Sequence, residues 1–342
     1  MRTADHAAVN ETVDLVKGLS GKEKGFAGLV NAVLRKAVRE REKLLATIEA
    51  KPEENLPDWL QSSWSETYGF DQMRAMAATL SGEPMLDISL KPGMDKETWA
   101  NKLQSDLMPT GTLRRASADV PTLPGYEAGE WWVQDMAAAV PATLFSDVSG
   151  KHVLDLCAAP GGKTMQLATM GAKVTAVDRN KNRMKRLEAN LQRTGLSAKI
   201  EIADASTFNP ETPADHVLLD APCSATGTFR RNPDVLWTKG LGDVEKLTAL
   251  QARILDHAFS LLPVSGTLVY CVCSLEAAEG AEQINAFLKR APKASRLPIN
   301  ADELGGLAEL LTPAGDLLCL PSLLPERGGM DGFFAARLTK VA

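Results

Sequence analysis

The chain is poor in aromatic residues and in histidine. Of its 342 residues, 5% are aromatic and four are histidine. The histidines are spread along the chain without a ligand or catalytic partner at useful spacing, so we interpret them as structural: His6, His152, His216 and His257. No apolar run reaches the roughly 18 residues of a transmembrane helix, and the first residues lack the apolar core of a signal peptide. These absences favour a globular protein of the cytoplasm that does not bind membranes.

Cysteine is scarce as well. The five cysteines are an odd number and include no C-x-x-C pair. This pattern lacks the usual zinc-binding spacing and argues against a disulfide framework, so we expect free thiols in a reducing compartment and no metal. Cys157 and Cys319 are interpreted as packing residues, and Cys271 is expected to point away from Cys273.

The chain also lacks an excess of positive charge. Its net charge is −5 and its pI is about 5.6, which argues weakly against a large polyanionic partner. Basic residues nevertheless cluster in one predicted helix with its approach and in two predicted loops: Arg179, Lys181, Arg183, Lys185, Arg186 and Arg193, and the doublets Arg114–Arg115 and Arg230–Arg231. Such clusters are as typical of solvated helix faces as of surfaces that bind phosphates.

The length and the 44% of hydrophobic residues are typical of a globular chain with two or three domains. Apolar residues at helical spacing predict a helical segment over residues 1–50. Residues 51–124 are interpreted as a helical linker, with Trp59 and Trp64 in its core, followed by a small α+β insert. Residues 125–342 form the largest predicted domain.

Strands and helices alternate within this domain. The pattern predicts strands over residues 152–156, 173–178, 198–203, 215–220, 266–273 and 332–339. It predicts helices over residues 163–170, 180–194, 244–262 and 276–290. Alternating units of this kind indicate an α/β fold with a parallel, doubly wound sheet.

Two cysteines stand where buried strands end. Cys223 follows the apolar run Val217–Leu219, and Cys273 follows the run 266–272. The carboxyl ends of the strands form the rim of the ligand crevice in an open α/β sheet. We therefore expect two strands to deliver two thiols to one pocket, where covalent chemistry on a group-transfer substrate is possible.

The loop at residues 155–164, Asp-Leu-Cys-Ala-Ala-Pro-Gly-Gly-Lys-Thr, is typical of neither a Walker A motif nor a G-x-G-x-x-G motif. It still provides glycines and the start of a helix. Asp178 ends the second strand, where an acid accepts hydrogen bonds from ribose hydroxyls, and Asp204 follows the third, where it suits the adenine amine. These acids, without a phosphate-binding loop, favour S-adenosylmethionine over NAD or ATP. Asp155 is interpreted as a structural or methionine-end residue.

The motifs together resemble the Nol/Nop/Sun RNA (cytosine-5) methyltransferases. The resemblance rests on the loop at 155–164, Asp-Ala-Pro-Cys-Ser at 220–224, Gly-Thr-Phe-Arg-Arg-Asn-Pro-Asp at 227–234, Val-Cys-Ser at 272–274 and the closing strand at 331–338. Residues 6–11 and 28–34 are similar to the last helices of the NusB-like RNA-binding domain in the subgroup that acts on 16S ribosomal RNA. The resemblance implies a Rossmann-like, S-adenosylmethionine-dependent methyltransferase sheet, preceded by a partial NusB-like segment.

The resemblance also implies roles for individual residues. It assigns the nucleophile that attacks carbon 6 of cytosine to Cys273, and breakdown of the covalent intermediate to Cys223. Asp220 and Lys163 are expected to contact the target base, and backbone phosphates are expected to be held by Arg230, Arg231 and the basic residues of the cluster at 179–193. The expected cofactor-binding residues come from the loop and from the following strand ends: Cys157, Ala158, Ala159, Pro160, Gly161, Gly162, Lys163, Asp178, Arg183, Asp204 and Asp220. The implied partner is RNA, in particular 16S ribosomal RNA, free or in an early assembly intermediate, and the protein is expected to be a monomer.

Three departures from the family pattern and three alternatives accompany this interpretation. The NusB-like segment is short, the insert at residues 85–90 lacks the Arg and Asn that the family often has there, and two residues next to the thiol motifs differ: Val272 stands where the family usually has Thr, and Ala225 where it has Gly. Since DNA cytosine methyltransferases use the Pro-Cys thiol as nucleophile, Cys223 is the rival to Cys273. A ribosome-assembly RNA-binding factor with a vestigial cofactor site is a second alternative, which loss of a thiol would favour. The third is an amino-group methyltransferase, although such enzymes typically have Asn-Pro-Pro-Tyr in place of Asp-Ala-Pro-Cys.

Overall fold

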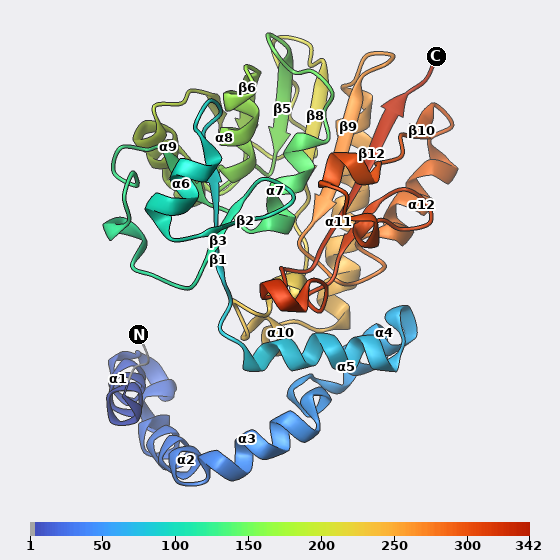
Figure 1. The fold of residues 1–342 in the computed structure, drawn as a ribbon. Coiled ribbons are helices and arrows are strands. Elements are labelled where there is room, and N and C mark those ends of the chain that lie inside the picture. The colour runs from blue at the N-terminus through green and yellow to red at the C-terminus, as the bar shows by residue number, and fades with distance from the viewer. Residues whose placement is uncertain (1–3) are drawn as a thin grey trace. The chain divides into compact units, whose positions relative to one another are not determined.

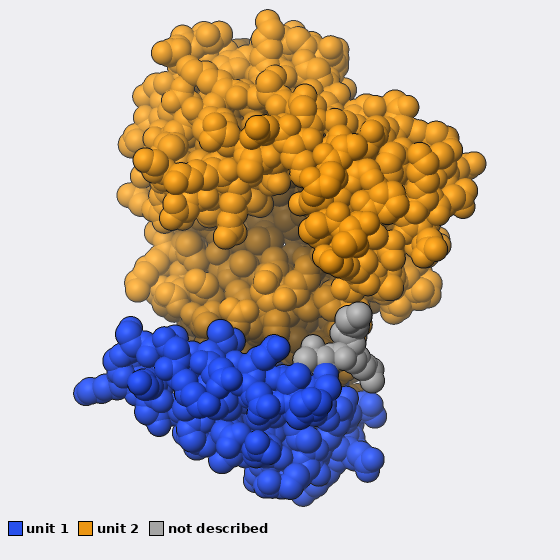
Figure 2. All heavy atoms as spheres, turned by 90° about the vertical axis from the view of Figure 1, so that its left-hand side faces the viewer, with its two compact units in different colours: residues 1–55 blue, residues 56–342 orange. Residues whose placement is uncertain are grey.

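The computed structural model describes residues 4–342, which belong to two compact units, residues 1–55 and 56–342 (Figures 1 and 2). The first unit contains three helices: α1 (Asp5–Gly18), α2 (Ala27–Arg39) and α3 (Arg41–Ala50). Its helices agree with the predicted helical segment, of which residues 1–3 lie outside the described part. Of the described helices, none is both long and apolar enough to cross a membrane.

The second unit begins with two helices, α4 (Asp58–Tyr68) and α5 (Phe70–Ala78). They form a small core with α10 (Val235–Thr238) and the segment after Cys273. Trp64 is fully buried there and donates a hydrogen bond from Nε1 to Glu276 Oε1 at 2.8 Å. The prediction that Trp64 belongs to a core is therefore confirmed.

A four-stranded antiparallel sheet follows, in the order β2-β3-β1-β4. Its elements are β1 (Leu86–Leu90), α6 (Lys96–Leu103), β2 (Asp106–Leu107), β3 (Leu113–Arg115) and β4 (Trp131–Val133). A separate apolar cluster around Ile88 and Trp131 holds it together. Arg114, predicted in a loop, lies in strand β3 instead.

The main sheet has the strand order β10-β12-β9-β8-β5-β6-β7, with β11 paired to β12. Its strands are β5 (His152–Leu156), β6 (Lys173–Val177), β7 (Lys199–Glu201), β8 (His216–Asp220), β9 (Thr267–Val272), β10 (Ala294–Arg296), β11 (Leu317–Cys319) and β12 (Phe333–Lys340). Strands β5 to β9 are parallel, as predicted. The prediction of a fully parallel sheet is wrong at one side, because β12 enters antiparallel between β9 and β10.

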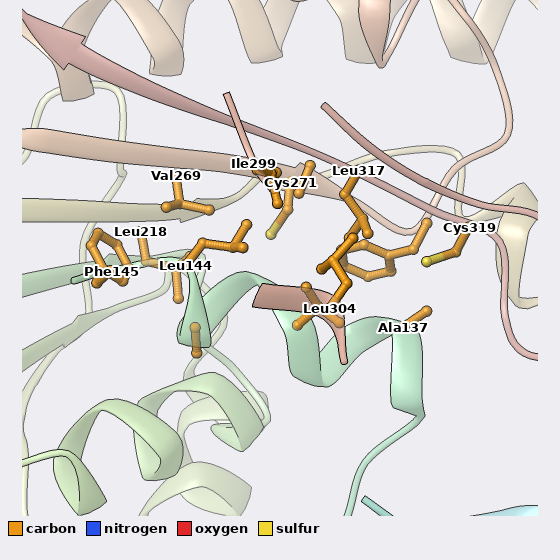
Figure 3. Packing of buried hydrophobic residues seen from close by; sticks show 14 of the residues in the cluster. Ala137, Leu144, Phe145, Leu218, Val269, Cys271, Ile299, Leu304, Leu317 and Cys319 are labelled. Carbon is orange, nitrogen blue, oxygen red and sulfur yellow. The ribbon is translucent and has the colours of Figure 1, made fainter. Parts of the chain in front are cut away.

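Helices cover both faces of this sheet. Residues of α7 (Met136–Thr143), α8 (Gly162–Thr169) and α9 (Lys181–Thr194) pack in the apolar clusters of one face. Those of α11 (Leu241–Ser260) and α12 (Ala281–Arg290) pack in the cluster of the other. Figure 3 shows the first face, where Ala137 of α7 and Leu304 lie opposite Val269 and Cys271 of β9.

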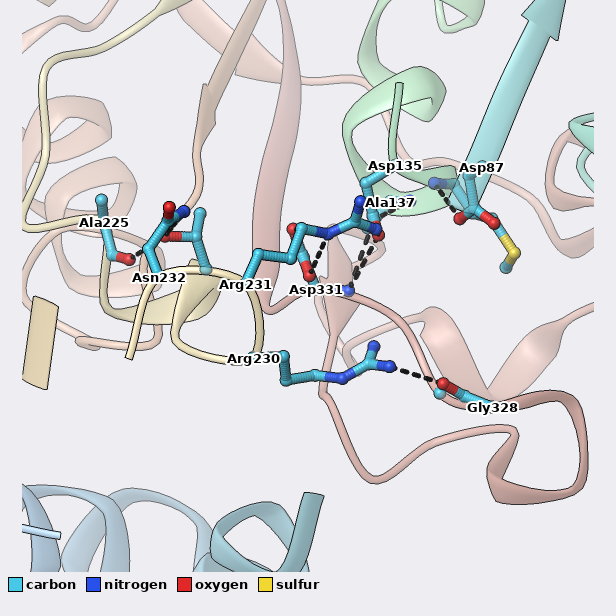
Figure 4. Close-up of polar contacts among 12 residues, drawn as sticks. Asp87, Asp135, Ala137, Ala225, Arg230, Arg231, Asn232, Gly328 and Asp331 are labelled. Atoms are coloured by element: carbon cyan, nitrogen blue, oxygen red, sulfur yellow. Dashed lines mark hydrogen bonds and ion pairs between the residues drawn. The ribbon is translucent and has the colours of Figure 1, made fainter. Parts of the chain in front are cut away.

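Buried ion pairs lie where the small sheet meets the main domain, and Asp87 of the small sheet accepts a hydrogen bond from the backbone N of Met136 in α7 at 2.8 Å. Arg114 donates hydrogen bonds from Nε and Nη2 to the two oxygens of Asp87, both at 2.6 Å. Nearby, Arg231 pairs with Asp135, which precedes α7, and with Asp331, which precedes β12 (Figure 4). The side chains of Arg114 and Asp87 are 3% and 0% exposed, so their charges depend on each other.

Replacing one member of this buried pair is expected to be costly. Arg114→Met removes the cation and leaves the Asp87 carboxylate buried without its partner, so we expect a loss of about 3–5 kcal/mol in the free energy of unfolding. Arg115→Met is the matched control on the same strand, because Arg115 is partly exposed and is expected to lose about 1 kcal/mol at most. Urea denaturation of both variants measures the difference, and equal losses would contradict the structural role of the pair.

Candidate active site

The two predicted thiols lie side by side at the carboxyl edge of the main sheet. Strands β8 and β9 are parallel neighbours with Asp220 opposite Cys271 in register. The chain therefore leaves both strands at the same edge, and Cys223 Sγ comes within 3.5 Å of Cys273 Sγ. Both thiols are half-buried and free. The structure brings together the two cysteines that the sequence analysis singled out.

The Cys223 thiol is held in its protonated form. The hydrogen bond to Cys273 and burial raise its pKa well above the ordinary value. A protonated Cys223 can donate its hydrogen to a neighbouring sulfur, and a thiolate on Cys273 would be its acceptor. The two sulfurs are therefore suited to unequal roles.

Lys163 and Asp220 form an ion pair beside the thiols. Lys163 lies in the first turn of α8, with its Nζ 2.8 Å from Asp220 Oδ2. Burial opposes the charge on this ammonium, but the Asp220 carboxylate outweighs it and raises the pKa of Lys163. The Asp220 side chain is still 31% exposed, so the carboxylate remains accessible to a substrate.

The position of Cys271 contradicts the sequence analysis. Cys271 and Cys273 were expected to point apart, but both contact the same core cluster. Cys271 Sγ also lies 3.6 Å from Asp220 Oδ1. The physical reason is the two-residue period of a strand, which places residues i and i+2 on the same face.

The loop after β5 has the shape of a cofactor loop. Gly161 has a φ of 104°, and a Cβ atom there would come within 2.8 Å of Leu187 Cγ. Only glycine fits both the left-handed backbone and this close packing against α9. The turn brings the backbone from Cys157 to Gly162 along the sheet edge, where a ligand can approach it.

A cavity of about 160 Å³ lies beside this loop. Its lining combines carboxylates, cationic side chains and apolar groups from five segments: Cys157, Asp178, Arg179, Asn180, Arg183, Asp204, Ala205, Pro222, Leu250 and Ile254. The two carboxylates suit the hydroxyl and amine donors of a nucleoside, and the apolar residues suit the faces of its base. Four of the predicted cofactor-binding residues thus line one cavity: Cys157, Asp178, Arg183 and Asp204.

Asp178 and Asp204 differ in their burial and in their hydrogen bonds within this cavity. Asp178 is 5% exposed and accepts a hydrogen bond from the backbone of Asn180 at 2.8 Å, while Arg183 Nη1 lies 3.5 Å from its Oδ2. Asp204 is exposed, and hydrogen bonds from Ser206 lower its pKa. Asp178 is therefore held in place by the protein, whereas Asp204 is open to solvent, and both line the cavity.

A second cavity, of about 320 Å³, borders the Lys163–Asp220 pair. Its walls include Trp132, Gly162 and Arg193. The loop residues Ala158 and Pro160 also line this cavity. The ion pair is therefore reachable from outside the protein.

Asp155 is buried beneath the loop. Its Oδ2 accepts a hydrogen bond from Thr164 Oγ1 at 2.5 Å, whereas its Oδ1 has no hydrogen-bond partner within residues 4–342. Burial raises the pKa of Asp155 to about 7. An unpaired buried oxygen at this place fits a site that is completed by a ligand donor.

Two of the predicted basic residues serve the protein itself. Arg193 donates hydrogen bonds to the carbonyl oxygens of Tyr126 and Trp131 at 2.7 and 3.1 Å. Arg231 is engaged by Asp135 and Asp331. The prediction that both contact RNA phosphates is therefore not supported by their surroundings, whereas Lys181 and Lys185 of α9 are exposed.

Sequence reasoning missed the buried acid Glu279, which lies in the loop before α12. It accepts hydrogen bonds from the residues that follow both thiols, Ser224 and Ser274. No sequence signal distinguishes it from neighbouring acids, because the segment 276–282 contains three glutamates of which one is exposed. Within residues 4–342, no group of three or more His, Cys, Asp or Glu side chains is arranged to hold a metal ion.

Comparison with known proteins identifies relatives of this chain. The family described as "16S rRNA methyltransferase RsmB/F" matches residues 142–339, and the NusB family matches residues 1–39. "Ribosomal RNA small subunit methyltransferase B" of Cronobacter sakazakii is 35% identical, over 99% of this chain and 79% of the relative. The protein of the same name from Pseudomonas syringae pv. tomato is 36% identical, over 100% of this chain and 78% of the relative.

One solved structure illustrates the shared fold. The structure of NSun6 from Pyrococcus horikoshii with SFG superimposes with a TM-score of 0.71 at 18% identity, over 84% of this chain and 98% of that one. At this identity the likeness concerns the fold.

The raised pKa of Asp155 predicts a pH dependence of stability. A carboxyl whose pKa rises from 3.8 to about 7 on folding stabilises the protein fully below pH 3.8 and loses this contribution as the pH rises through 7. The free energy of unfolding of the wild type, relative to Asp155→Asn, should fall by about 4 kcal/mol at most between pH 4 and pH 8. Denaturation of both proteins without ligand measures it. Parallel curves would show that Asp155 is ionised throughout.

Proposed function

The chain belongs to the 16S rRNA methyltransferase RsmB/F family and is an RNA methyltransferase; we propose that it methylates carbon 5 of a cytosine in 16S ribosomal RNA through a covalent bond to Cys273. The family takes its methyl group from S-adenosylmethionine. The observation that carries the proposal is the pair of thiols 3.5 Å apart beside the exposed Asp220 carboxylate.

The chemistry explains why thiols are needed. Carbon 5 of cytosine is a weak nucleophile. When a thiolate adds to carbon 6, the electrons of the C5–C6 double bond become available at carbon 5, which can then accept an electrophilic methyl group. Loss of the proton from carbon 5 restores the double bond and expels the thiolate. S-adenosylmethionine, when bound, supplies the methyl group as an electrophile.

The environment of the thiols favours Cys273 as the nucleophile. The hydrogen bond to Cys273 and burial raise the pKa of Cys223. A thiol that stays protonated is a poor nucleophile. Cys223 therefore suits the breakdown of the adduct, where its S–H can donate a hydrogen bond to the Cys273 sulfur as that sulfur leaves carbon 6.

Asp220 and Lys163 are proposed to hold the target base. Asp220 keeps an exposed oxygen that can accept a hydrogen bond from the cytosine amino group or from a protonated ring nitrogen. Lys163 fixes the direction of this carboxylate through the 2.8 Å ion pair. A cytosine in a stacked helix cannot reach such a site, so the target must be flipped out or single-stranded.

The residues around the cofactor loop fit S-adenosylmethionine. Asp178 would accept from the ribose hydroxyls, and Asp204 from the adenine amine, within the cavity that they share. The loop from Cys157 to Lys163 and Arg183 would border the remainder, with Asp220 near the methyl group. The unpaired Asp155 Oδ1 marks the place for a donor at the methionine end.

RNA is the proposed partner over a wider surface. Exposed basic residues of α9, together with Arg230, are proposed to contact backbone phosphates. The catalytic domain is proposed to span residues 125–342. Two segments before it are proposed to add RNA contacts: the NusB-like segment at 1–50, and the linker and insert at 51–124. Ribosomal RNA is made and modified in the bacterial cytoplasm, so we propose that the enzyme acts there. We also propose that it acts as a monomer. The substrate is free RNA or an early assembly intermediate.

The competing functions explain less of the geometry. An RNA-binding assembly factor has no use for two thiols at 3.5 Å, and an amino-group methyltransferase needs no thiol.

Trapping with a substrate analogue tests the mechanism. The protein is mixed with S-adenosylmethionine and 16S RNA that contains 5-fluorocytosine, which lacks the proton that must leave carbon 5. We expect a protein–RNA adduct that survives denaturation in the wild type and in Cys223→Ser, and none in Cys273→Ser. An adduct lost only in Cys223→Ser would reverse the two roles. Its absence in all three, with RNA and cofactor bound, would favour the non-covalent alternatives.

The cofactor assignment has its own test. Asp178→Asn removes the charge of a hydrogen-bond acceptor, so we expect the Kd for S-adenosylhomocysteine to rise about 10- to 100-fold. Glu201→Gln is the matched control, because Glu201 ends the neighbouring strand β7 and pairs with Lys199 outside the cavity. Calorimetric titration of both variants measures the effect, and an equal Kd for the two would remove Asp178 from the site.

A further inference from the structure

A fully buried carboxylate connects the two loops that carry the thiols. Glu279 is 0% exposed. Its oxygens accept hydrogen bonds from the Ser224 backbone N at 2.9 and 3.2 Å, and from the Ser224 hydroxyl at 2.5 Å. They also accept from the Ser274 hydroxyl at 2.5 Å and from Gln251 Nε2 at 2.9 Å. Glu279 thus touches the residue directly after each thiol.

Glu279 forms no ion pair within residues 4–342. A buried acid without a cation must have its oxygens satisfied by hydrogen bonds. Neutral donors from three segments provide them: the loop after β8, the loop after β9 and helix α11. The side chain of Glu279 therefore connects these three segments.

Glu279 adds to a small number of other links between these loops: the Ser224 and Ser274 hydroxyls lie 3.1 Å apart, and Leu275 N donates a hydrogen bond to Thr226 Oγ1 at 3.0 Å. Strand pairing between β8 and β9 ends at Asp220 and Cys271, before either thiol. Beyond it, the backbone hydrogen bond from Gly227 N to Cys273 O at 3.0 Å joins the loops again, on the far side of Cys223. Glu279 contacts both loops between these two points, at the residues directly after the thiols, and so helps to set the distance between the two sulfurs.

We propose that Glu279 is a positioning residue of the methyl transfer, which holds Cys223 and Cys273 at their short separation through the two following serines. This proposal rests on the proposed function for its catalytic consequence, but the positioning itself is independent of it. Glu279 touches neither the sulfurs nor the accessible cavities, so it acts through the loops.

The variant Glu279→Gln keeps the shape and replaces one acceptor oxygen by a donor. The matched control is Glu276→Gln, three residues earlier. Glu276 is also buried, but its carboxylate accepts from Trp64 and Ser63 on α4, with a further hydrogen bond from Thr226. Both variants change a buried acid, but only Glu279→Gln changes the shared acceptor of Ser224 and Ser274, the residues directly after the thiols.

Two rates distinguish the variants. The first is adduct formation with 5-fluorocytosine RNA, which we expect to slow about 10- to 100-fold in Glu279→Gln, because small misplacements of reacting groups have effects of this size. The second is formation of the Cys223–Cys273 disulfide with diamide, which takes up the two electrons and two protons that the thiols lose. We expect it to slow by a similar factor. The Kd for S-adenosylhomocysteine should be unchanged, and Glu276→Gln should resemble the wild type in both rates.

The outcomes separate the two proposals. Wild-type rates of both reactions in Glu279→Gln would overturn the positioning role. Equal slowing in Glu276→Gln would also overturn it, because general destabilisation would then explain the effect. Absence of an adduct in the wild type would refute the proposed function, while the disulfide rates would still test the positioning. If Glu279→Gln does not fold, Ser224→Ala and Ser274→Ala each remove one donor and are expected to show smaller reductions in the same two rates.

Discussion

The parallel pairing of β8 and β9 is the constraint on which the site depends. The two thiols are 50 residues apart in the chain, and only the register that sets Asp220 opposite Cys271 brings them to one edge. A shift by one residue would turn every side chain of a strand to the other face and would place one thiol in the core. The helices on both faces fix this register, because the inward residues of β8 and β9 alternate between the two apolar clusters.

Charge is distributed around this edge with few cations. Lys163 is the buried ammonium among Asp155, Asp178 and Asp220, and it neutralises only the last of them. Arg183 offsets the charge of Asp178 in part, since its Nη1 lies 3.5 Å from Oδ2. Asp155 and Asp220 lie on β5 and β8, at the edge where the two thiols follow β8 and β9.

Much of the fold and of the site could be predicted from the sequence, and the exceptions have physical causes. Strands β5, β6, β8 and β9 have apolar runs that end in short motifs, so the chain itself marks their carboxyl ends. The antiparallel entry of β12 could not be predicted, since its apolar pattern is that of any buried strand and its direction depends on the connection before it. The arginines were misjudged for a related reason. Arg114 and Arg231 resemble surface residues until the acids that bind them, Asp87 and Asp135, are placed beside them by the fold.

The role of Glu279 could not be predicted either, because hydrogen bonds between loops leave no periodicity in a sequence. Local backbone strain is likewise not visible in the sequence. Ala225, directly after Cys223 and Ser224, has a left-handed backbone with a φ of 59°. The Nol/Nop/Sun family, which the chain resembles, usually has glycine at this position. The fold therefore holds this turn against the preference of its own residue.

The interior position of β12 has a consequence for how the molecule is made. Residues 333–340 lie between β9 and β10, so β9, the strand that leads to Cys273, has an unpaired edge until they arrive. During synthesis from the N-terminus, β5 to β9 and their helices leave the ribosome earlier and can begin to assemble. The growing chain nevertheless carries an open sheet edge at β9, which can pair with other strands, until residues 333–340 have been translated. The sheet that presents Cys273 is therefore closed by a segment made about 60 residues after that cysteine.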